Sequence, residues 1–421
     1  MKLSGKNRSL LTVAMAMAAM AVFAGNAAAD EYHYNTTLIG ERPAGMGGAY
    51  TAVSDDASGM YYNPAGIVYS PGSNISASVN AFSVYTKQYE NAIGNYKYAR
   101  QSQNFQPNFF GVVQHTPLGT VGFSYAIPDS MLESQDQSMP SPNSALSSYN
   151  INFNKEYNLY NVGPSWARDI NNDFKFGVTL YYHYKRQKTI NNVTQTLLSA
   201  LSSGAAGQGL WSNVYYKLEE LGFRPIVGLV WAPENGKYSV GLALSQTYIY
   251  DASQYTQITT NYNSSTLAVA NAAPSITRTN TIPQYPIVAK MGVAYFPSNA
   301  LLFAGDLTYS SQVTADTGAY GWDRKSLINF ALGMEYFTSS SFAVRTGVFS
   351  DYTNVADLKV ARDMVDMYGV SLSGSWFAKS TAITAGFTYG YGSGDSNPAD
   401  NGTKKLSLQS TMIFIGTSYS Y

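Results

Sequence analysis

The 421-residue sequence contains no cysteine, only three histidines and few charged residues, which make up 12% of the chain. Without cysteine the chain has no disulfide framework, no thiol catalyst and no thiolate metal site. Its 26 basic and 26 acidic residues balance, so no cationic surface indicates nucleic acid or anionic lipid as a partner. The fold must therefore close by other means than covalent or metal crosslinks.

Long apolar runs are also absent after residue 29, so no later segment has the roughly 20 apolar residues of a membrane helix. Three basic residues among the first eight positions precede an apolar stretch, residues 10–24, and the small-residue triplet Ala27–Ala29. This order is typical of a secretory signal peptide, and the apolar stretch is too short for a permanent anchor. We expect a signal peptide over 1–29 and a mature chain that begins at Asp30.

Aromatic residues and glycine are abundant, with 35 Tyr, 19 Phe and 36 Gly. A membrane protein without apolar helices has to be a closed β-barrel, because every backbone polar group in hydrocarbon must be paired within the protein. Segments of about ten residues with period-2 alternation recur throughout, as in a transmembrane barrel. The fourteen expected strands are 75–87, 105–115, 120–127, 156–168, 173–187, 223–232, 237–250, 283–296, 301–313, 325–337, 341–351, 366–378, 381–392 and 405–421.

The connections between these strands alternate strictly between short and long. Short ones are 116–119, 169–172, 233–236, 297–300, 338–340 and 378–380. Long ones are 88–104, 128–155, 188–222, 251–282, 314–324, 352–365 and 393–404. Short periplasmic turns opposite long extracellular loops are typical of outer-membrane barrels. A soluble sandwich or propeller, the alternative, has no reason to sort its loops in this way.

Side-chain alternation assigns one face of each strand to lipid and the other to the lumen. In 173–187 the apolar face runs from Phe174 to Tyr184, and the opposite face carries Lys175, His183 and Lys185. The same parity places Glu335 and Arg345 in the lumen. Three tryptophans near the periplasmic strand ends predict an aromatic girdle; they are Trp166, Trp231 and Trp376.

The last strand ends in residues 413–421, where apolar or aromatic residues alternate with small ones up to Tyr421. This ending resembles the signal by which the barrel assembly machinery recognises outer-membrane proteins, although the usual terminal residue is Phe. We therefore expect insertion among outer-membrane lipids.

The stretch 40–66 is too rich in glycine and turn-forming residues for a long helix or strand. Because about 350 residues of alternating strands follow, we expect 30–72 to fold as a plug inside a barrel formed by 73–421. No apolar strand precedes the glycine cluster and no Gly-Lys-Ser/Thr follows it, so it does not indicate a phosphate-binding loop or a bound cofactor. The candidate plug and gating residues are Gly45, Gly47, Gly48, Asp55, Asp56, Asn63, Pro64, Ala65 and Gly66.

Three parts of this stretch resemble the N-terminal hatch of a known family: 45–50 (GMGGAY), 55–57 (DDA) and 62–66 (YNPAG). The family is the FadL family of outer-membrane transporters for long-chain fatty acids and other hydrophobic compounds, including the toluene-type members. The resemblance extends over the whole mature chain in architecture, but its specific motif covers only the hatch. It implies a Gram-negative outer-membrane location, capture of ligand by extracellular loops, hatch displacement and lateral release.

Lateral release in that family uses a kink in the third strand. Here the candidate kink is Pro128, which cannot donate to a strand ladder; alternatively, Pro128 begins the following loop. Two regions offer apolar surface for loop capture, or for packing between loops. One is a short helix expected over 196–201 together with Leu210 and Trp211, and the other is 264–273.

A fatty acid needs a cationic partner for its carboxylate. Lumen parity nominates Lys175, Lys185, Arg224, Lys290 and Arg345. Each of these has an alternative role in the lumen, such as a salt bridge of Arg345 with Glu335 or of Lys290 with Asp306. A neutral hydrocarbon would need none of them.

The sequence lacks the features of two other kinds of outer-membrane barrel, a phospholipase and a nonspecific porin. An outer-membrane phospholipase would need Ser and His on adjoining strands, but the sequence has no nucleophile-elbow motif and its histidines are His33, His115 and His183. A nonspecific porin would have a charged constriction and no plug. We expect a passive, non-enzymatic transporter, with a hydrocarbon channel or a secretion-associated barrel that binds protein partners as alternatives.

Overall fold

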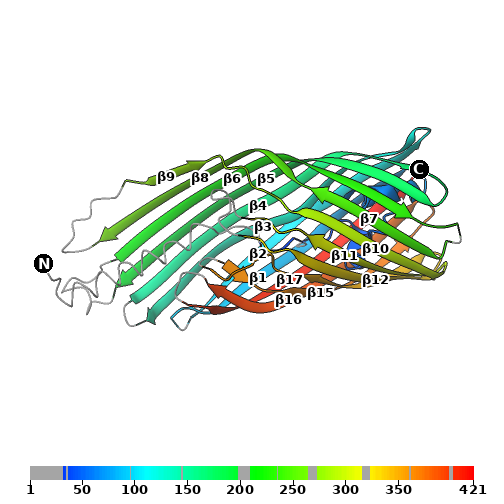
Figure 1. Cartoon of the computed structure of the whole chain (residues 1–421). Coiled ribbons are helices and arrows are strands. Elements are labelled where there is room, and N and C mark those ends of the chain that lie inside the picture. The colour runs from blue at the N-terminus through cyan, green and yellow to red at the C-terminus, as the bar shows by residue number, and fades with distance from the viewer. Residues whose placement is uncertain are drawn as a thin grey trace.

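The computed structural model is a closed, antiparallel β-barrel (Figure 1). It describes residues 32–34, 37–94, 96–143, 146–197, 209–234, 236–263, 273–314, 323–359, 362–397 and 402–421. Its sheet has seventeen segments, of which three pairs, β7 with β8, β9 with β10, and β14 with β15, are consecutive pieces of single strands. Seventeen segments minus three breaks leave the fourteen strands that the sequence predicts.

The segments have the following bounds. They are β1 (Asn74–Ile93), β2 (Tyr96–Thr116), β3 (Gly119–Asn143), β4 (Leu146–Asp169), β5 (Phe174–Leu197), β6 (Gly209–Trp231), β7 (Tyr238–Gln246), β8 (Tyr248–Asn263), β9 (Ser275–Thr279), β10 (Ile287–Ser298), β11 (Leu301–Ser310), β12 (Leu327–Ser339), β13 (Phe342–Asp351), β14 (Arg362–Met364), β15 (Met367–Phe377), β16 (Thr381–Asn397) and β17 (Lys404–Ser420). Because β1 pairs with both β2 and β17, the first and last strands meet and the sheet closes into a barrel.

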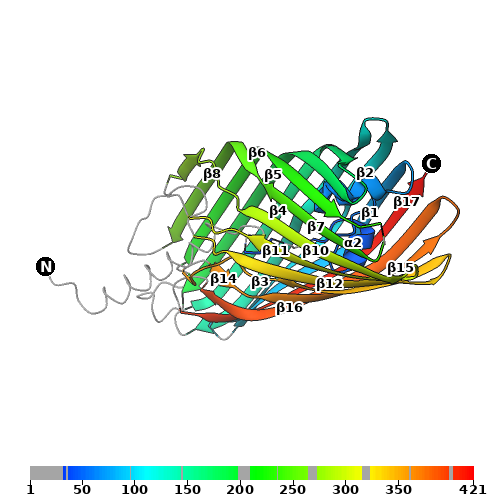
Figure 2. The same cartoon turned by 45° about the vertical axis from the view of Figure 1, so that its right-hand side comes forward.

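The barrel wall is much taller on one side than on the other. The strands β3, β4 and β5 have 25, 24 and 24 residues, whereas β11 and β13 have 10 each. A strand needs about 9–11 residues to cross a bilayer. The long strands therefore project at one end, opposite the short turns (Figure 2).

This extension corrects the long loops expected over 88–104, 128–155, 188–222 and 251–282, most of whose described residues are strand. The outward faces there are polar, as in the row Asn150, Asn152 and Asn154 of β4. Backbone pairing continues across these residues, and the alternation is inverted, with Tyr149, Ile151 and Phe153 buried on the inner face. The alternation therefore indicated the apolar band of the barrel and missed the polar continuation.

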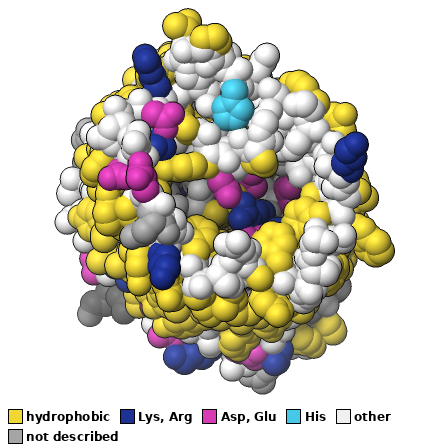
Figure 3. Space-filling view, turned by 90° about the vertical axis from the view of Figure 1, so that its right-hand side faces the viewer, with side chains coloured by type: hydrophobic (Ala, Val, Ile, Leu, Met, Phe, Trp, Pro, Cys, Tyr) yellow, Lys and Arg dark blue, Asp and Glu magenta, His cyan; other side chains and the backbone are white. Residues whose placement is uncertain are grey.

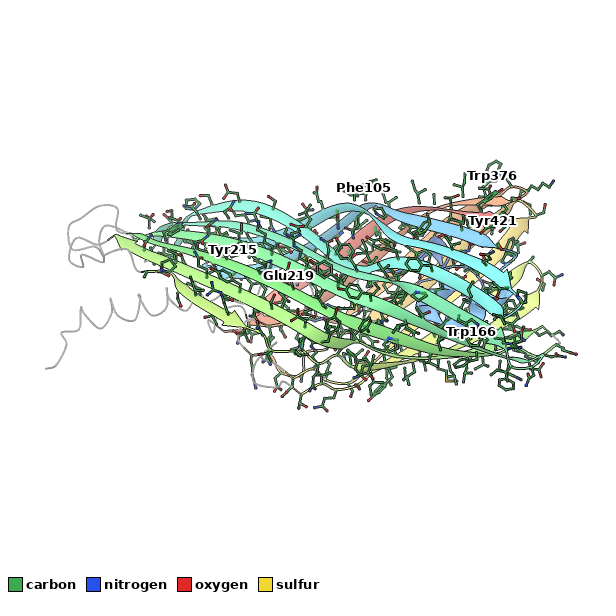
Figure 4. The ribbon with its side chains drawn as sticks, turned by 90° about the horizontal axis from the view of Figure 1, so that it is seen from above. Phe105, Trp166, Tyr215, Glu219, Trp376 and Tyr421 are labelled. Carbon is green, nitrogen blue, oxygen red and sulfur yellow. The ribbon has the colours of Figure 1, made fainter. Side chains whose placement is uncertain are left out.

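Within the apolar band, burial follows the predicted parity. Lys175, His183 and Lys185 are buried in the lumen, while Phe174 and Leu180 are exposed on the outer face. Trp231 is exposed as well, and Trp166, Trp376 and Tyr421 lie toward the short-turn end (Figure 4). This arrangement is the one expected of an aromatic girdle.

The predicted signal peptide, 1–29, lies outside the described residues. Among those that are described, no helix is long and apolar enough to cross a membrane.

Candidate functional site

Residues 37–70, called the plug from here on, pack against the inner wall near the short-turn end (Figure 2). They contain the short helices α2 (Glu41–Gly45) and α3 (Gly59–Tyr62) and the 3-10 helix η2 (Pro64–Tyr69). Met46, Tyr50 and Met60 are completely buried. The plug therefore forms a small core together with the inward faces of the strands.

Glycines on the barrel wall make room for this packing. A Cβ atom at Gly228 would lie 2.0 Å from Asn63 Oδ1, and one at Gly347 would lie 2.3 Å from the carbonyl carbon of Met46. Sequence reasoning assigned no role to these glycines, because their importance depends on contacts with a distant segment. The barrel glycines that approach plug atoms in this way are Gly111, Gly122, Gly177, Gly228, Gly241, Gly292, Gly333, Gly347 and Gly416.

The plug's own glycines are equally constrained. Gly47 and Gly48 have φ values of 66° and 87°, in the left-handed region that side chains disfavour. Gly45 ends α2 against β15, where its carbonyl accepts a hydrogen bond from Ser371 Oγ (2.9 Å). An added Cβ at Gly66 would lie 2.5 Å from the Ser54 carbonyl oxygen. Each of these candidate residues occupies a position where a larger side chain would clash or be strained.

Asn63 connects the plug to the wall. Its Nδ2 donates to the Thr51 carbonyl (2.8 Å) and to the Leu229 carbonyl of β6 (3.0 Å), and its Oδ1 accepts from the Ala65 amide (3.2 Å). It thereby caps η2, whose first residue, Pro64, has no amide hydrogen to satisfy. Asn63 through Ala65 have structural roles here and do not line the cavity described below.

A chain of alternating charges joins the plug to β12 and β13. Arg42 pairs with Asp55 of the plug and forms a bidentate contact with Glu335 (2.7 and 3.1 Å), which also pairs with Arg345 (2.6 Å). Arg345 in turn donates to Ser375 Oγ. The predicted alternative for Arg345, a salt bridge with Glu335, is confirmed. Arg42, the central residue, was missed because nothing in its sequence context relates it to β12.

The short-turn end is hollowed, and acidic and basic side chains lie side by side in the hollow (Figure 3). The Arg42 and Asp55 side chains are 20% and 34% exposed, whereas Glu335 is 2% exposed. Water at this end therefore reaches the plug side of the charge chain, while its wall side is dry.

Two further carboxylates lie close together in the plug. Asp56 Oδ1 accepts from Ser58 N and Ser58 Oγ (2.8 and 2.5 Å). Glu41 is buried between the Ser76 hydroxyl, 3.4 Å from each carboxylate oxygen, and Gly416 of β17. Burial, aided by the negative charge of Asp56 and opposed by Arg345, raises the pKa of Glu41 from 4.5 to about 7.

We predict that the plug becomes less firmly seated as pH rises from about 4.5 to about 7. A seated Glu41 keeps a proton that a solvated Glu41 releases, so this contribution is complete below about pH 4.5 and is lost as pH passes about 7. At about 1.4 kcal/mol per pKa unit, the loss is roughly 3 kcal/mol. Hydrogen exchange in 40–66, corrected for intrinsic rates, should show falling protection in the wild type and little change in Glu41→Gln. Equal pH dependence in the two proteins would contradict the assignment, and Glu219→Gln on the outer wall is the matched control.

Above the plug lies a cavity of about 180 Å³. Arg224 of β6 and Lys290 of β10 line it, with the Arg224 guanidinium 4.9 Å from the Tyr61 ring centre and Lys290 Nζ 4.9 Å from that of Tyr62. Neither cation forms an ion pair with a carboxylate among the described residues. The Asp306 predicted as a partner of Lys290 instead accepts from the amides of Tyr50 and Thr51 (2.9 and 2.8 Å).

The other candidate cations form ion pairs with carboxylates. Lys175 pairs with Asp169 (2.9 Å) beside a short turn, and Lys185 pairs with Glu220 (3.3 Å). Three of the five candidates, Lys185, Arg224 and Lys290, line the cavity. Of these, Arg224 and Lys290 have no carboxylate partner within the described part of the chain. Lumen parity predicts that Arg224 and Lys290 face the lumen. It does not predict that they lack a carboxylate partner among the described residues.

The cavity extends to Pro128 and Asp129 of β3. Here β3 stays extended and continues to Asn143, so the alternative that Pro128 begins a loop is wrong. However, its backbone pairing with β2 lapses between Ala126 and Glu133. The facing part of β2 contains Pro107, a second residue without an amide hydrogen, which the sequence reasoning did not single out.

Side chains partly bridge this interruption. Ser130 Oγ donates to Gln106 Oε1 (3.0 Å) and accepts from Asn104 Nδ2 (2.5 Å). Phe105, in the same part of β2, is 70% exposed on the outer face (Figure 4). The wall between β2 and β3 is thus held by side chains in place of a ladder.

Apolar side chains line the inner face of the tall wall. One cluster includes Tyr89, Tyr98, Met139 and Tyr149, and a second joins Met131 and Tyr157 to Leu159. Because Tyr157 and Leu159 also line the cavity, the apolar lining continues from the tall wall down to it.

Of the residues expected to capture ligand, Leu210 belongs to the first of these clusters. Of the helix predicted over 196–201, Thr196 and Leu197 belong to β5, and Leu210 and Trp211 belong to β6, so the helix is wrong for these residues. Residues 198–201, and 264–272 of the other segment, lie outside the described residues. In the tall wall, apolar inner residues alternate with polar outer residues. A search for continuous apolar runs therefore does not find them.

The histidines have different surroundings. His33 Nε2 lies 2.8 Å from the Val365 carbonyl, and His115 contacts Thr120 Oγ1 and the Ser70 carbonyl (2.9 and 2.8 Å). His183 lines the cavity. None of the three forms a hydrogen bond with a serine hydroxyl in the described part of the chain.

Several solved structures share this fold. The chain is similar to the monoaromatic hydrocarbon channel CymD (16% identity, TM-score 0.60), covering 92% of this chain and 99% of that one. It is also similar to the Ralstonia pickettii toluene transporter TbuX (11% identity, TM-score 0.64), covering 92% of this chain and 100% of that one. A Pseudomonas aeruginosa FadL homologue is similar too (14% identity, TM-score 0.58), with 92% of this chain and 99% of that one covered. No known family profile matches the sequence, and no curated protein does. The resemblance predicted from the plug motif is confirmed in the fold over most of the chain.

Proposed function

We propose that the chain is a passive, non-enzymatic transporter of hydrophobic molecules in the outer membrane of a Gram-negative bacterium. One observation carries this proposal: a single cavity touches the plug, the two cations without carboxylate partners and the interrupted pairing of β2 with β3. A water-filled channel would give an apolar solute no favourable contact, whereas apolar walls bind it and a lateral opening releases it into hydrocarbon.

The proposed route begins on the apolar inner face of the tall wall and continues past Tyr157 into the cavity. Displacement of the plug then enlarges the space beside Pro128, and the ligand leaves between β2 and β3. In this scheme residues 30–72 form the moving part and 73–421 the barrel, after removal of 1–29 as a signal peptide. Assembly depends on the barrel assembly machinery, which recognises the last strand.

We assign a long-chain fatty acid as the ligand in preference to a neutral hydrocarbon. Arg224 and Lys290 lie over tyrosine rings of the plug and have no carboxylate partner among the described residues. A ligand carboxylate could therefore form charge-assisted hydrogen bonds with both of them. The hydrocarbon channels among the structural neighbours support the alternative of aromatic or aliphatic hydrocarbon uptake. A barrel that binds protein partners would be favoured by a stoichiometric partner with an empty lumen.

Uptake by proteoliposomes that contain the purified protein tests this assignment. Charge-assisted hydrogen bonds contribute about 1.5–3 kcal/mol, so Arg224→Gln and Lys290→Gln should each weaken hexadecanoate binding roughly tenfold to a hundredfold and leave hexadecane uptake unchanged. Lys217→Gln, in an exposed ion pair on the outer wall, is the matched control. Uptake of hexadecane alone would favour the hydrocarbon alternative, and uptake of neither compound would contradict transport.

A further inference from the structure

Two polar side chains in the cavity wall have no hydrogen-bond partner among the residues that the structure describes. Asn161 of β4 and His183 of β5 lie directly opposite each other across the strand pair. They are 0% and 1% exposed and both line the cavity. Neither amide atom of Asn161 and neither ring nitrogen of His183 forms a hydrogen bond. Buried polar groups are paired in nearly all native structures, so four orphaned atoms at one place call for an explanation.

Neighbouring polar groups do not provide the missing partners. Glu220 accepts from Tyr285 Oη (2.7 Å) and pairs with Lys185 (3.3 Å). Tyr285 presents its ring edge-on to His183, with centres 5.6 Å apart. The Tyr285 hydroxyl, which could have formed a hydrogen bond with His183, is therefore directed toward Glu220.

The orphaned pair lies next to one of the two cations. Arg224 is the cross-strand partner of Tyr181, and His183 follows Tyr181 by two residues on the same face of β5. Arg224 and His183 are thus diagonal neighbours, which are about 7–8 Å apart in a sheet. A ligand whose carboxylate sits at Arg224 has its first few carbons beside Asn161 and His183.

We propose that this pair is a second polar subsite, and that the preferred ligand is a carboxylic acid carrying a hydroxyl close to its carboxyl end. The inference rests on the proposed transport function and specifies the substrate of the same cavity. A hydroxyl group both donates and accepts, and so do an asparagine amide and a neutral imidazole. A hydrocarbon would leave the four atoms unpaired, and a plain fatty acid would place methylene groups against them.

Binding to the purified full-length protein in detergent tests this inference. The probes are hexadecanoic acid, its beta-hydroxy derivative and its omega-hydroxy derivative, measured by isothermal titration calorimetry. The beta-hydroxy acid should bind about tenfold more tightly than the plain acid, as expected for one buried hydrogen bond. The omega-hydroxy acid should show no such gain, because its hydroxyl lies far from Asn161 and His183.

Two variants remove the subsite with little change in shape. In Asn161→Leu and in His183→Phe, which keeps a ring against Tyr285, the preference for the beta-hydroxy acid should disappear while the plain acid binds at least as tightly as in the wild type. Asn152→Leu, on the outer face of the same strand and in its tall part, should change neither affinity.

The outcomes distinguish failure of this inference from failure of the proposed transport function. Equal affinity of the wild type for plain and beta-hydroxy acids, as ordered water at the subsite would produce, overturns the inference and leaves fatty-acid transport intact. A preference that persists in both variants also overturns it. If the wild type binds none of the acids, the assignment of a fatty acid as the ligand fails, and the inference fails with it.

Discussion

Oxidation of a Gly45→Cys/Ser373→Cys variant is expected to stop uptake, and reduction is expected to restore it. A Cβ atom at Gly45 would lie 3.0 Å from Ser373 Cβ, slightly closer than the roughly 3.5–4.5 Å of a disulfide. The natural chain has no cysteine, so this is the only disulfide that the variant can form. It would tie the plug to β15 and prevent the plug displacement that the proposed transport route requires.

Uptake by the same sample before and after reduction is the measurement, and the loss on oxidation should be nearly complete. The two single cysteine variants, treated identically, control for the effect of each substitution alone. Unchanged uptake by the fully oxidised double variant would show that the plug does not move away from β15 during transport.

Replacing Arg42 by methionine is expected to release the plug and make the barrel leak. The change removes the cation between Asp55 and Glu335, and Glu335 is buried. Glu335 keeps Arg345 as a partner, so the cost is smaller than the about 3–5 kcal/mol of leaving a buried charge unpaired. The change nevertheless breaks the charge chain that joins the plug to β12, which acts together with the packing of the buried plug side chains against the wall.

Ion conductance in planar bilayers should rise by an order of magnitude or more in Arg42→Met, with frequent open events in place of a quiet baseline. Lys97→Met, which breaks an exposed pair with Glu90, is the matched control, because such surface pairs contribute little. A silent Arg42→Met protein with an unchanged barrel would mean that packing alone seats the plug.

Strand number and the faces of the strands could be predicted from the sequence, because the alternation that reveals them comes from contact with hydrocarbon. The rows Lys175 to Lys185 and Glu335 with Arg345 were assigned correctly for that reason. The full lengths of β1 to β6 were not predicted, because outside the bilayer the outer face of a strand becomes polar and the apolar outer face by which the strands were identified ends there. The row Asn150, Asn152 and Asn154 has the composition of a loop and the backbone of a strand.

The candidate site was predictable only where both partners lie close in sequence. Arg345 and Glu335 face each other across a tight turn, so parity and distance along the chain sufficed. Arg42 pairs with Glu335, which is 293 residues away in the sequence. A side chain at Gly347 would clash with Met46 of the plug, which is also distant in the sequence. Asn161 and His183 become neighbours only once the register of β4 on β5 is known.

The unequal height of the wall gives the barrel a preferred side of approach. A strand of 24 residues is about 80 Å long at 3.3 Å per residue, against about 33 Å for the 10 residues of β11. A solute arriving from the side of β3 to β5 meets a polar outer surface, while one arriving over β11 to β13 faces the apolar inner surface directly. In a crowded membrane, a neighbour standing against the low side would therefore slow uptake more than an equal neighbour against the high side.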